Sequence, residues 1–456
     1  MKILLLNPPA QSLYLRDMYS STKSKWGYSW PPTDILLLSG ILCREHEIQL
    51  LDANILKLSP EEALLKIDKD INVVVFMIGS SSLYSDIEFI RKLKEKIPNI
   101  KAIGTGGCLL HKPEFFLERF VEIDAVLLNF VTNSILDYLN NKSDIKNLVY
   151  RKDNKIINGG NYFPKNNFIV PIPRHELLPI NKYILPHGKR NPITSVLTSF
   201  GCPYKCSYCV VQNIEYLARN IENVLEELRY IEKLGIKEII FRDNTFGVNK
   251  ERTKELCRKI IQEKIDISWV CDSRVDVLND KELLLLMKKS GCHTIHFGLE
   301  SGDDEILKKY NKGITQEDMK KTFALCRDVG IKTMGYFIIG LPGENKESII
   351  KTILLAKNLD CDYASFNIPI PIYGTKLREE AIKNKWINDN VDVFDGSFFP
   401  VIETEDLTTR DVWSLRNLAI RRFYLRPRFI FKKLVGIRSM SDLLFLLKNF
   451  KLLYSK

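Results

Sequence analysis

Three cysteines lie close together in the middle of the 456-residue chain, where Cys202, Cys206 and Cys209 form a C-x3-C-x2-C spacing. Three thiolates on one tight loop can hold a cubane iron–sulfur cluster by three of its irons, whereas a cluster normally takes four Cys ligands. The remaining iron would stay open to a substrate, as a catalytic metal keeps one position vacant. The alternatives are a zinc site or three ordinary buried thiols. Zinc would need a fourth ligand nearby, and the nearest histidine, His187, lies upstream of the preceding strand-like run.

This spacing resembles the signature of the radical S-adenosylmethionine (SAM) enzymes. The resemblance implies that the open iron of a 4Fe–4S cluster chelates the amino and carboxylate groups of SAM. It also implies that an electron from the cluster breaks the C–S bond of SAM and yields a 5′-deoxyadenosyl radical. A flavodoxin- or ferredoxin-type protein would supply that electron.

The elements that must position the cysteines form a repeating pattern between residues 190 and 375, where strand-like and helical segments alternate about six times. The predicted strands are 194–200, 238–241, 268–271, 294–298, 333–339 and 363–372, and the predicted helices between them are 220–234, 250–262, 281–288, 316–329 and 347–359. Six parallel units fit the partial (β/α)6 barrel of the radical SAM enzymes. Reactive groups in such barrels gather at the carboxyl ends of the strands.

Polar residues at these predicted strand ends match the SAM-binding positions of the family. The resemblance assigns SAM contacts to Tyr208, Asp243, Asn244, Arg274, Glu300, Ser301, Gly340 and Pro342. It places Tyr208 beside the adenine, Asp243 and Asn244 at the amino end, and Arg274 on the carboxylate, which a guanidinium binds bidentately. Glu300 and Ser301 would contact the ribose and methionine, and Gly340 and Pro342 the adenine edge. Taken alone, the carboxylate of Asp243 or Glu300 would more often cap a helix or form a salt bridge than bind a ligand.

Residues 1–145 also alternate strand and helix, which predicts an α/β, Rossmann-like parallel sheet wound on both faces. The predicted strands are 2–6, 48–51, 73–78, 102–104 and 125–129, and the predicted helices are 34–45, 60–67, 85–96, 113–120 and 133–139. Ligands on such sheets lie at the carboxyl ends of the strands.

This first part resembles the cobalamin-binding domain that precedes the barrel in one large class of radical SAM enzymes. The shared features are the opening LLNPP, the Leu51-Asp-Ala53 turn and the segment 106–113, and the implied cobalamin contacts are Ser81, Ser82, Gly106, Gly107 and Asn129. The chain lacks a D-x-H-x-x-G motif, so no histidine is placed to ligate cobalt from below. The acidic G-E-G-E turn is replaced by Asn129-Phe-Val-Thr-Asn133. A degenerate domain kept for packing or substrate binding is the alternative.

Two further segments divide the chain. Residues 14–32 form a long aromatic loop, which either lines a substrate or cofactor channel or packs down locally. Residues 146–186 are predicted as a linker, with a hairpin at 147–158 and then several prolines that keep the chain extended. The predicted domains are therefore 1–145, 187–390 for the barrel, and 391–456 for a helical, basic C-terminal region.

The distribution of charged residues and cysteines indicates the cellular compartment in which the protein works. The net charge is +11, and much of the excess lies in the last fifty residues, where basic and apolar residues alternate. This tail is predicted either to close the open barrel or to lie on a membrane surface, while contact with an RNA backbone is the least favoured alternative. The ten cysteines are scattered apart from the central three, which favours a reducing cytoplasm, with peripheral membrane contact through the tail.

Together these features predict a radical SAM enzyme that methylates an unactivated carbon of a small-molecule, lipid or natural-product substrate with the help of cobalamin. One alternative is coupling, cyclisation or hydrogen abstraction without cobalamin. A tRNA methylthiotransferase would need a second cluster held by three cysteines in the first domain, which offers only Cys43 and Cys108. A non-catalytic binding module is disfavoured by the intact cysteines and strand-end polar residues.

Overall fold

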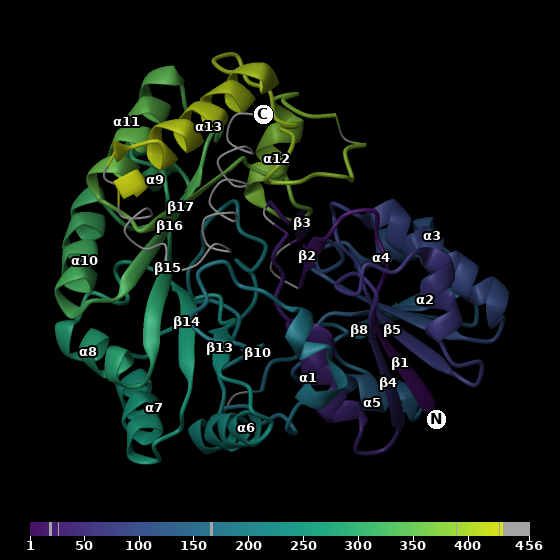
Figure 1. Cartoon of the computed structure of the whole chain (residues 1–456). Helices are drawn as coiled ribbons and strands as arrows, with labels where there is room; N and C mark the ends of the chain where they lie inside the picture. Colours follow the sequence, from purple (N-terminus) through teal and green to yellow (C-terminus); the bar gives the residue numbers. More distant parts are fainter. Residues whose placement is uncertain (18–20, 26, 165–166, 389, 428, 432–456) are drawn as a thin grey trace.

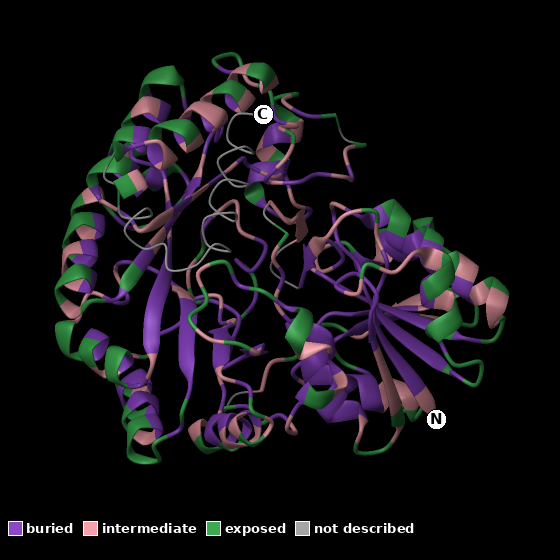
Figure 2. Ribbon diagram, viewed as in Figure 1, coloured by how far each residue is buried: buried purple, intermediate pink, exposed green. Residues whose placement is uncertain are grey.

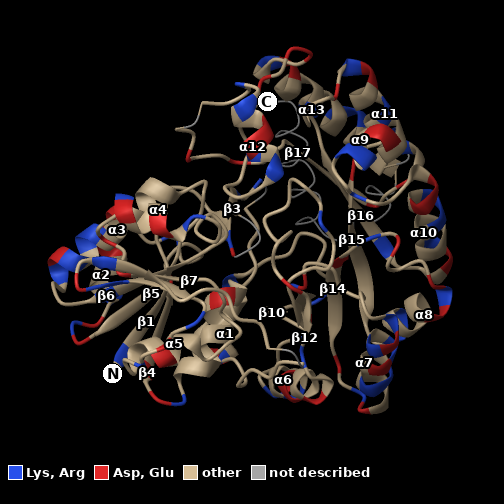
Figure 3. Ribbon diagram, turned by 180° about the vertical axis from the view of Figure 1, so that it is seen from behind, with Lys and Arg blue, Asp and Glu red and all other residues tan. Residues whose placement is uncertain are grey.

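The computed structural model describes residues 1–431 apart from 18–20, 26, 165–166, 389 and 428. Two α/β units lie side by side, an N-terminal sheet with its helices and a larger curved sheet with helices on its outer face (Figure 1). In both units most strand residues are buried, and the outer helices alternate buried and exposed faces (Figure 2). The outer helices carry Lys, Arg, Asp and Glu side by side (Figure 3). In this view, acidic and basic residues are interspersed along these helices.

The N-terminal unit is a seven-stranded sheet in the order β4-β1-β5-β6-β7-β8-β9. Its parallel strands are β1 (Lys2–Asn7), β4 (Glu47–Asp52), β5 (Val73–Met77), β6 (Lys101–Thr105) and β7 (Ala125–Leu127). Its helices are α1 (Thr33–Leu42), α2 (Pro60–Lys66), α3 (Leu83–Lys96), α4 (Pro113–Arg119) and α5 (Ser134–Leu139). The predicted doubly wound sheet is confirmed. The strand order reverses between β1 and β5, so a ligand crevice is expected at the carboxyl ends of these two strands.

The predicted hairpin does not belong to the linker. Strands β8 (Leu148–Lys152) and β9 (Lys155–Asn158) pair antiparallel with each other, and β8 pairs antiparallel with β7. The boundary predicted at residue 145 is therefore too early, because the first sheet continues to Asn158. The hairpin signal was local, whereas its pairing partner was not visible in the sequence. The rest of the linker is irregular, with two short 3₁₀ turns, η1 (His175–Leu177) and η2 (Ile180–Lys182).

The larger unit is a sheet of six parallel strands in chain order, which confirms the partial (β/α)6 barrel. The strands are β10 (Ile193–Val196), β13 (Glu238–Phe241), β14 (Ser268–Ser273), β15 (Cys292–Glu300), β16 (Lys332–Ile338) and β17 (Tyr363–Asn367). The covering helices are α6 (Ile221–Lys233), α7 (Lys250–Gln262), α8 (Lys281–Lys289), α10 (Gln316–Val329) and α11 (Lys346–Asn358), and two short helices, α9 (Asp304–Lys309) and α12 (Lys376–Lys383), were not predicted.

Three predicted segments differ from the structure. The run 194–200 is interrupted after β10, and β11 (Ser199–Phe200) pairs antiparallel with β12 (Leu217–Ala218) across the cysteine loop. Strand β17 ends at Asn367 rather than at 372, because Pro369 and Pro371 cannot donate to a ladder. The aromatic loop 14–32 contains a small hairpin, β2 (Tyr14–Arg16) and β3 (Ser21–Lys23).

The C-terminal helix α13 (Thr409–Tyr424) packs on the barrel. Val412, Ala419 and Phe423 are buried, and the Tyr424 hydroxyl donates to the Ala364 carbonyl of β17 at 2.6 Å. The packing interpretation is thus confirmed for this helix. The predictions for residues 432–456 lie outside the described residues. Within the described part of the chain, no helix is both long and apolar enough to cross a membrane.

Candidate active site between the two domains

The three cysteines line one cavity of about 470 Å³, which lies where the two domains meet. Cys202 and Cys206 are buried and Cys209 is partly buried. The β11–β12 pair closes the base of their loop, and the Cys209 amide donates to the Cys206 carbonyl at 3.0 Å. Gly201 has φ +74°, and an added Cβ there would lie 2.0 Å from the Glu215 carbonyl oxygen, so the turn into the loop requires glycine.

The donor set fits an iron–sulfur cluster. Among the described residues, no three His, Cys, Asp or Glu side chains are placed to hold a single metal ion. A cubane cluster instead takes one thiolate on each of three irons, which keeps the sulfurs apart. Burial raises the pKa of the Cys209 thiol to about 12, so the charge of a bound metal is needed to make it a thiolate.

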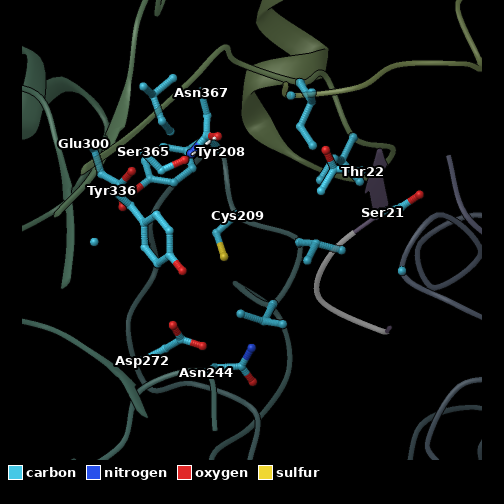
Figure 4. A pocket seen from close by; sticks show the side chains of 18 of the residues that line it. Ser21, Thr22, Tyr208, Cys209, Asn244, Asp272, Glu300, Tyr336, Ser365 and Asn367 are labelled. Carbon is cyan, nitrogen blue, oxygen red and sulfur yellow. Dashed lines mark hydrogen bonds between the residues drawn. The ribbon is translucent and has the colours of Figure 1, made fainter. Parts of the chain in front are cut away.

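Five of the predicted SAM residues line the same cavity: Tyr208, Asp243, Asn244, Arg274 and Glu300 (Figure 4 labels Tyr208, Asn244 and Glu300). The Asn244 Oδ1 atom is buried without a hydrogen-bond partner, so it offers an acceptor to an ammonium group. The Arg274 guanidinium forms two bonds of 3.0 Å with the Asp276 carboxylate and lies 3.8 Å from the Tyr204 ring centroid. The cavity therefore holds the unsatisfied polar atom that SAM would satisfy.

Asp243 lines the cavity, but its carboxylate is already used. It accepts from the Thr198 amide at 2.6 Å and from the Thr198 and Ser199 hydroxyls at 2.5 and 2.8 Å. Burial raises the pKa of Asp243, while these donors and the charge of Arg252 oppose that effect. The side chain predicted to contact SAM thus anchors the strand that leads into the cysteine loop.

Three predicted SAM residues do not line the cavity. Ser301 is fully buried, and its hydroxyl contacts Thr352 of α11 and Glu344 in the turn before it, so the predicted contact of Ser301 with SAM stays a prediction. Gly340 donates its amide to Glu344, and Pro342 accepts the Tyr310 hydroxyl. Their neighbours Ile338, the last residue of β16, and Leu341, in the turn that follows, line the cavity instead.

Lys312 is a site residue that the sequence did not reveal. It lines the cavity and donates to the Glu300 carboxylate at 2.8 Å, so it neutralises a charge next to the SAM residues. It follows the unpredicted helix α9, and no motif marks it. His111 lies in the segment 106–113 that resembles the cobalamin-binding domain. Its Nε2 atom lies 2.7 Å from the Val210 carbonyl oxygen, so the first domain contacts the cysteine loop directly.

Three of the predicted cobalamin residues, Gly106, Gly107 and Asn129, lie where a ligand could contact them. Gly107 lines the cavity and Gly106 has φ +149°, with space for no side chain because an added Cβ would lie 2.1 Å from the Ile78 carbonyl oxygen. The Asn129 Nδ2 atom is buried and without a hydrogen-bond partner, as is Thr105 Oγ1 at the end of β6. These two orphaned atoms at the carboxyl ends of the first sheet fit a polar ligand.

Ser81 and Ser82 are occupied by the chain itself. The Ser82 hydroxyl accepts from Arg16 at 3.0 Å and donates to Asp86 at 2.7 Å, and the Ser81 hydroxyl donates to the Ser21 carbonyl at 2.8 Å. The predicted contact of Ser81 and Ser82 with cobalamin therefore stays a prediction, and both hydroxyls already have partners within the chain. The hairpin in residues 14–32 covers this edge, and residues of that loop line the cavity, as expected if the loop lines a substrate or cofactor channel.

Comparison with known proteins agrees with this geometry. Residues 196–356 match the family model described as the radical SAM superfamily. An uncharacterized methyltransferase of Pyrococcus horikoshii is 32% identical over 95% of this chain and 94% of its own length. The chain belongs to the radical SAM superfamily.

Two further comparisons describe this radical SAM enzyme. An anaerobic magnesium-protoporphyrin IX monomethyl ester cyclase of Rubrivivax gelatinosus is 24% identical over 92% of this chain and 78% of its own length. The structure of the radical SAM methyltransferase TsrM of Kitasatospora setae, with cobalamin and a 4Fe–4S cluster bound, has a TM-score of 0.66 and 18% identity. It covers 85% of this chain and 79% of its own. At that identity the likeness shows a shared fold, and it extends over both domains.

Proposed function

We propose that this radical SAM enzyme is a cobalamin-dependent methyltransferase that acts on carbon. The observation that carries the proposal is the single cavity, which is lined by the three cysteines, by the SAM residues of the barrel and by Gly107 of the first sheet. A methyl carrier bound at the first sheet would thus open into the same space as SAM. The relative from Pyrococcus horikoshii, described as a methyltransferase, supports the same reaction class.

The residues of this chain would divide the work. Cys202, Cys206 and Cys209 would hold the cluster, and Asn244 and Arg274 would orient the amino and carboxylate ends of SAM. Gly106, Gly107 and the orphaned amide of Asn129 would hold cobalamin. When bound, the cluster supplies a low-potential electron and an open iron, and cobalamin supplies a methyl carrier. The protein supplies the orientation of these groups within a cavity that residues of both domains line.

The substrate is proposed to be a small molecule, either a natural product or a lipid, since the cavity also has to hold SAM. A flavodoxin- or ferredoxin-type donor is proposed to reduce the cluster in the cytoplasm. Contact with a membrane surface, if it occurs, is assigned to residues beyond Phe431, because α13 is used for packing.

A second function is favoured by one observation. The hairpin β2–β3 covers Ser81 and Ser82 at the crevice where the first sheet would receive a ligand. A relative described as a cyclase aligns with most of this chain. Radical coupling or cyclisation without cobalamin would follow if this edge stays closed.

The experiment that separates the two is an anaerobic absorption spectrum with iron and cobalt counts, on protein expressed with cobalamin supplied. Iron with one cobalt per chain, and transfer of a labelled methyl group from SAM, support the methyltransferase. Iron and SAM cleavage without cobalt support the second function. Cys206→Ala should abolish iron binding, whereas Cys257→Ala, which changes a buried core cysteine of α7, should keep it. Full iron content in Cys206→Ala would refute the cluster assignment.

A further inference from the structure

A layer of polar side chains crosses the interior of the barrel next to the cluster cavity. Arg242 follows β13, and Asp272, His296 and Tyr336 lie on β14, β15 and β16. Asp272 and His296 are direct partners in the register of neighbouring strands. All four side chains line the cavity, and none is among the predicted SAM or cobalamin residues. Figure 4 shows Asp272 and Tyr336 around the part of the cavity that Cys209 faces.

The layer is connected by short contacts. Arg242 bridges the carboxylates of Asp17 and Asp272 at 2.6 and 2.9 Å. The other Asp272 oxygen lies 2.9 Å from His296 Nδ1. The opposite ring nitrogen, His296 Nε2, lies 2.6 Å from His187 Nε2, and the Tyr336 hydroxyl lies 3.3 Å from His296 Nδ1. These contacts fix the orientation of the imidazole on both sides.

The contacts also determine which groups carry hydrogens. Burial alone would raise the pKa of Asp272, but the hydrogen bond from His296 and the charge of Arg242 hold it below its usual value. The carboxylate is therefore ionised, and His296 Nδ1 must be the nitrogen that carries hydrogen and donates to it. That nitrogen then has no lone pair for the Tyr336 hydroxyl. Burial raises the pKa of Tyr336 well above its usual value, so the phenol keeps its hydrogen and can direct it into the cavity.

The layer thus presents a hydrogen-bond donor, the Tyr336 hydroxyl, beside an acceptor, the Asp272 carboxylate. Resting on the methyltransferase function proposed above, we propose that Asp272, His296 and Tyr336 position the substrate. We further propose that they take a neutral molecule whose polar group offers an acceptor next to a donor, such as a carboxamide, a lactam or a hydroxyl. His296 acts through its neighbours, because it holds Asp272 and leaves the Tyr336 hydrogen to the ligand.

Charge and shape restrict the ligand further. Two carboxylates, those of Asp17 and Asp272, already share the one guanidinium of Arg242, so the layer does not favour a further carboxylate or phosphate. The nearby walls are aromatic: Tyr28 and Trp30 have ring centroids 5.9 Å apart, and Arg242 stacks 4.6 Å from the Trp30 ring centroid. A mainly apolar body with a neutral polar group fits both the walls and the layer. The head group of an anionic phospholipid does not.

The test uses the full chain with its cluster and cobalamin reconstituted, supplied with trideuteromethyl-labelled SAM and a small-molecule extract of the cells that make the protein. Labelled products are isolated by mass. The expected product of the wild-type protein carries a carboxamide, lactam or hydroxyl and no anionic group near the new methyl. A labelled carboxylate or phosphate without such a group overturns the substrate class. No labelled product from the wild-type protein rejects the methyltransferase function itself, and the present inference with it.

The positioning role is tested on two variants with the isolated product's precursor. Tyr336→Phe and His296→Asn should each raise KM about ten-fold or more, because a buried acceptor of the substrate loses its donor, while the bound iron and SAM binding report that the variant is folded. Tyr424→Phe and His293→Gln are matched controls, since each changes a buried side chain whose hydrogen bonds lie outside the cavity lining. Unchanged KM in both Tyr336→Phe and His296→Asn, or an equal rise in the controls, overturns the assignment.

Discussion

The anchoring of the cysteine loop by Asp243 gives a prediction whose size can be worked out. Replacing Asp243 with alanine leaves three donors without their acceptor: the Thr198 amide and the hydroxyls of Thr198 and Ser199. Both residues are at most 2% exposed, so water does not replace the carboxylate. An orphaned buried amide costs about 1–3 kcal/mol, and each lost hydroxyl bond about 1 kcal/mol. The total is about 3–5 kcal/mol, applied directly to the strand that leads into Cys202.

We expect Asp243→Ala to lose most of its iron when reconstituted anaerobically. Asp243→Asn should retain most of it, because the amide oxygen can still accept from the Thr198 N–H and the two hydroxyls can rotate to new partners. Iron and sulfide are counted per chain, and SAM affinity is measured on the iron-loaded fraction. If Asp243→Ala keeps full iron and loses only SAM affinity, the reasoning is refuted, and Asp243 acts by contacting SAM.

Three further predictions follow from other contacts. Glu344 is fully buried, and burial raises its pKa from the usual 4.5 to about 7. Its protonated form therefore stabilises the folded state fully below about pH 4.5. This contribution to the free energy of unfolding is lost as the pH rises toward 7. The loss of unfolding free energy between these two pH values is about 3 kcal/mol. Glu344→Gln should remove this pH dependence, measured by anaerobic urea unfolding. An unchanged dependence of stability on pH in the variant would contradict this prediction. His111→Ala should remove the 2.7 Å contact with the Val210 carbonyl oxygen. We expect it to change the electron paramagnetic resonance signal of the reduced cluster without lowering the iron content. An identical signal would show that the first domain does not position the cysteine loop. A chain ending at Phe431 should stay folded because α13 is retained, and it should bind anionic liposomes less than the full chain; equal binding would exclude the basic tail as the membrane contact.

Local patterns in the sequence were sufficient to predict most helices and strands of both domains. The alternation of apolar strands and amphipathic helices predicted a doubly wound sheet and a six-stranded barrel, and both are present in the predicted order along the chain. Helices α7 and α10 begin and end at the predicted residues, because caps such as Asn249 and Thr315 are local signals. The three cysteines needed only their spacing, since one short loop carries all of them.

Tertiary structure decided what each strand-end side chain does. The sequence places Asp243, Glu300 and Ser301 at strand ends, but only packing turns Asp243 toward Thr198, pairs Glu300 with Lys312 and directs Ser301 into the helix layer. The reason is that the type and position of a residue do not specify its partners, and hydrogen-bond partners distant in the chain are fixed only when the elements meet. The polar layer of Arg242, Asp272, His296 and Tyr336 exists for the same reason. Its residues lie after β13 and on β14, β15 and β16, and Asp17 of the N-terminal loop pairs with Arg242, so no single stretch of sequence contains the layer.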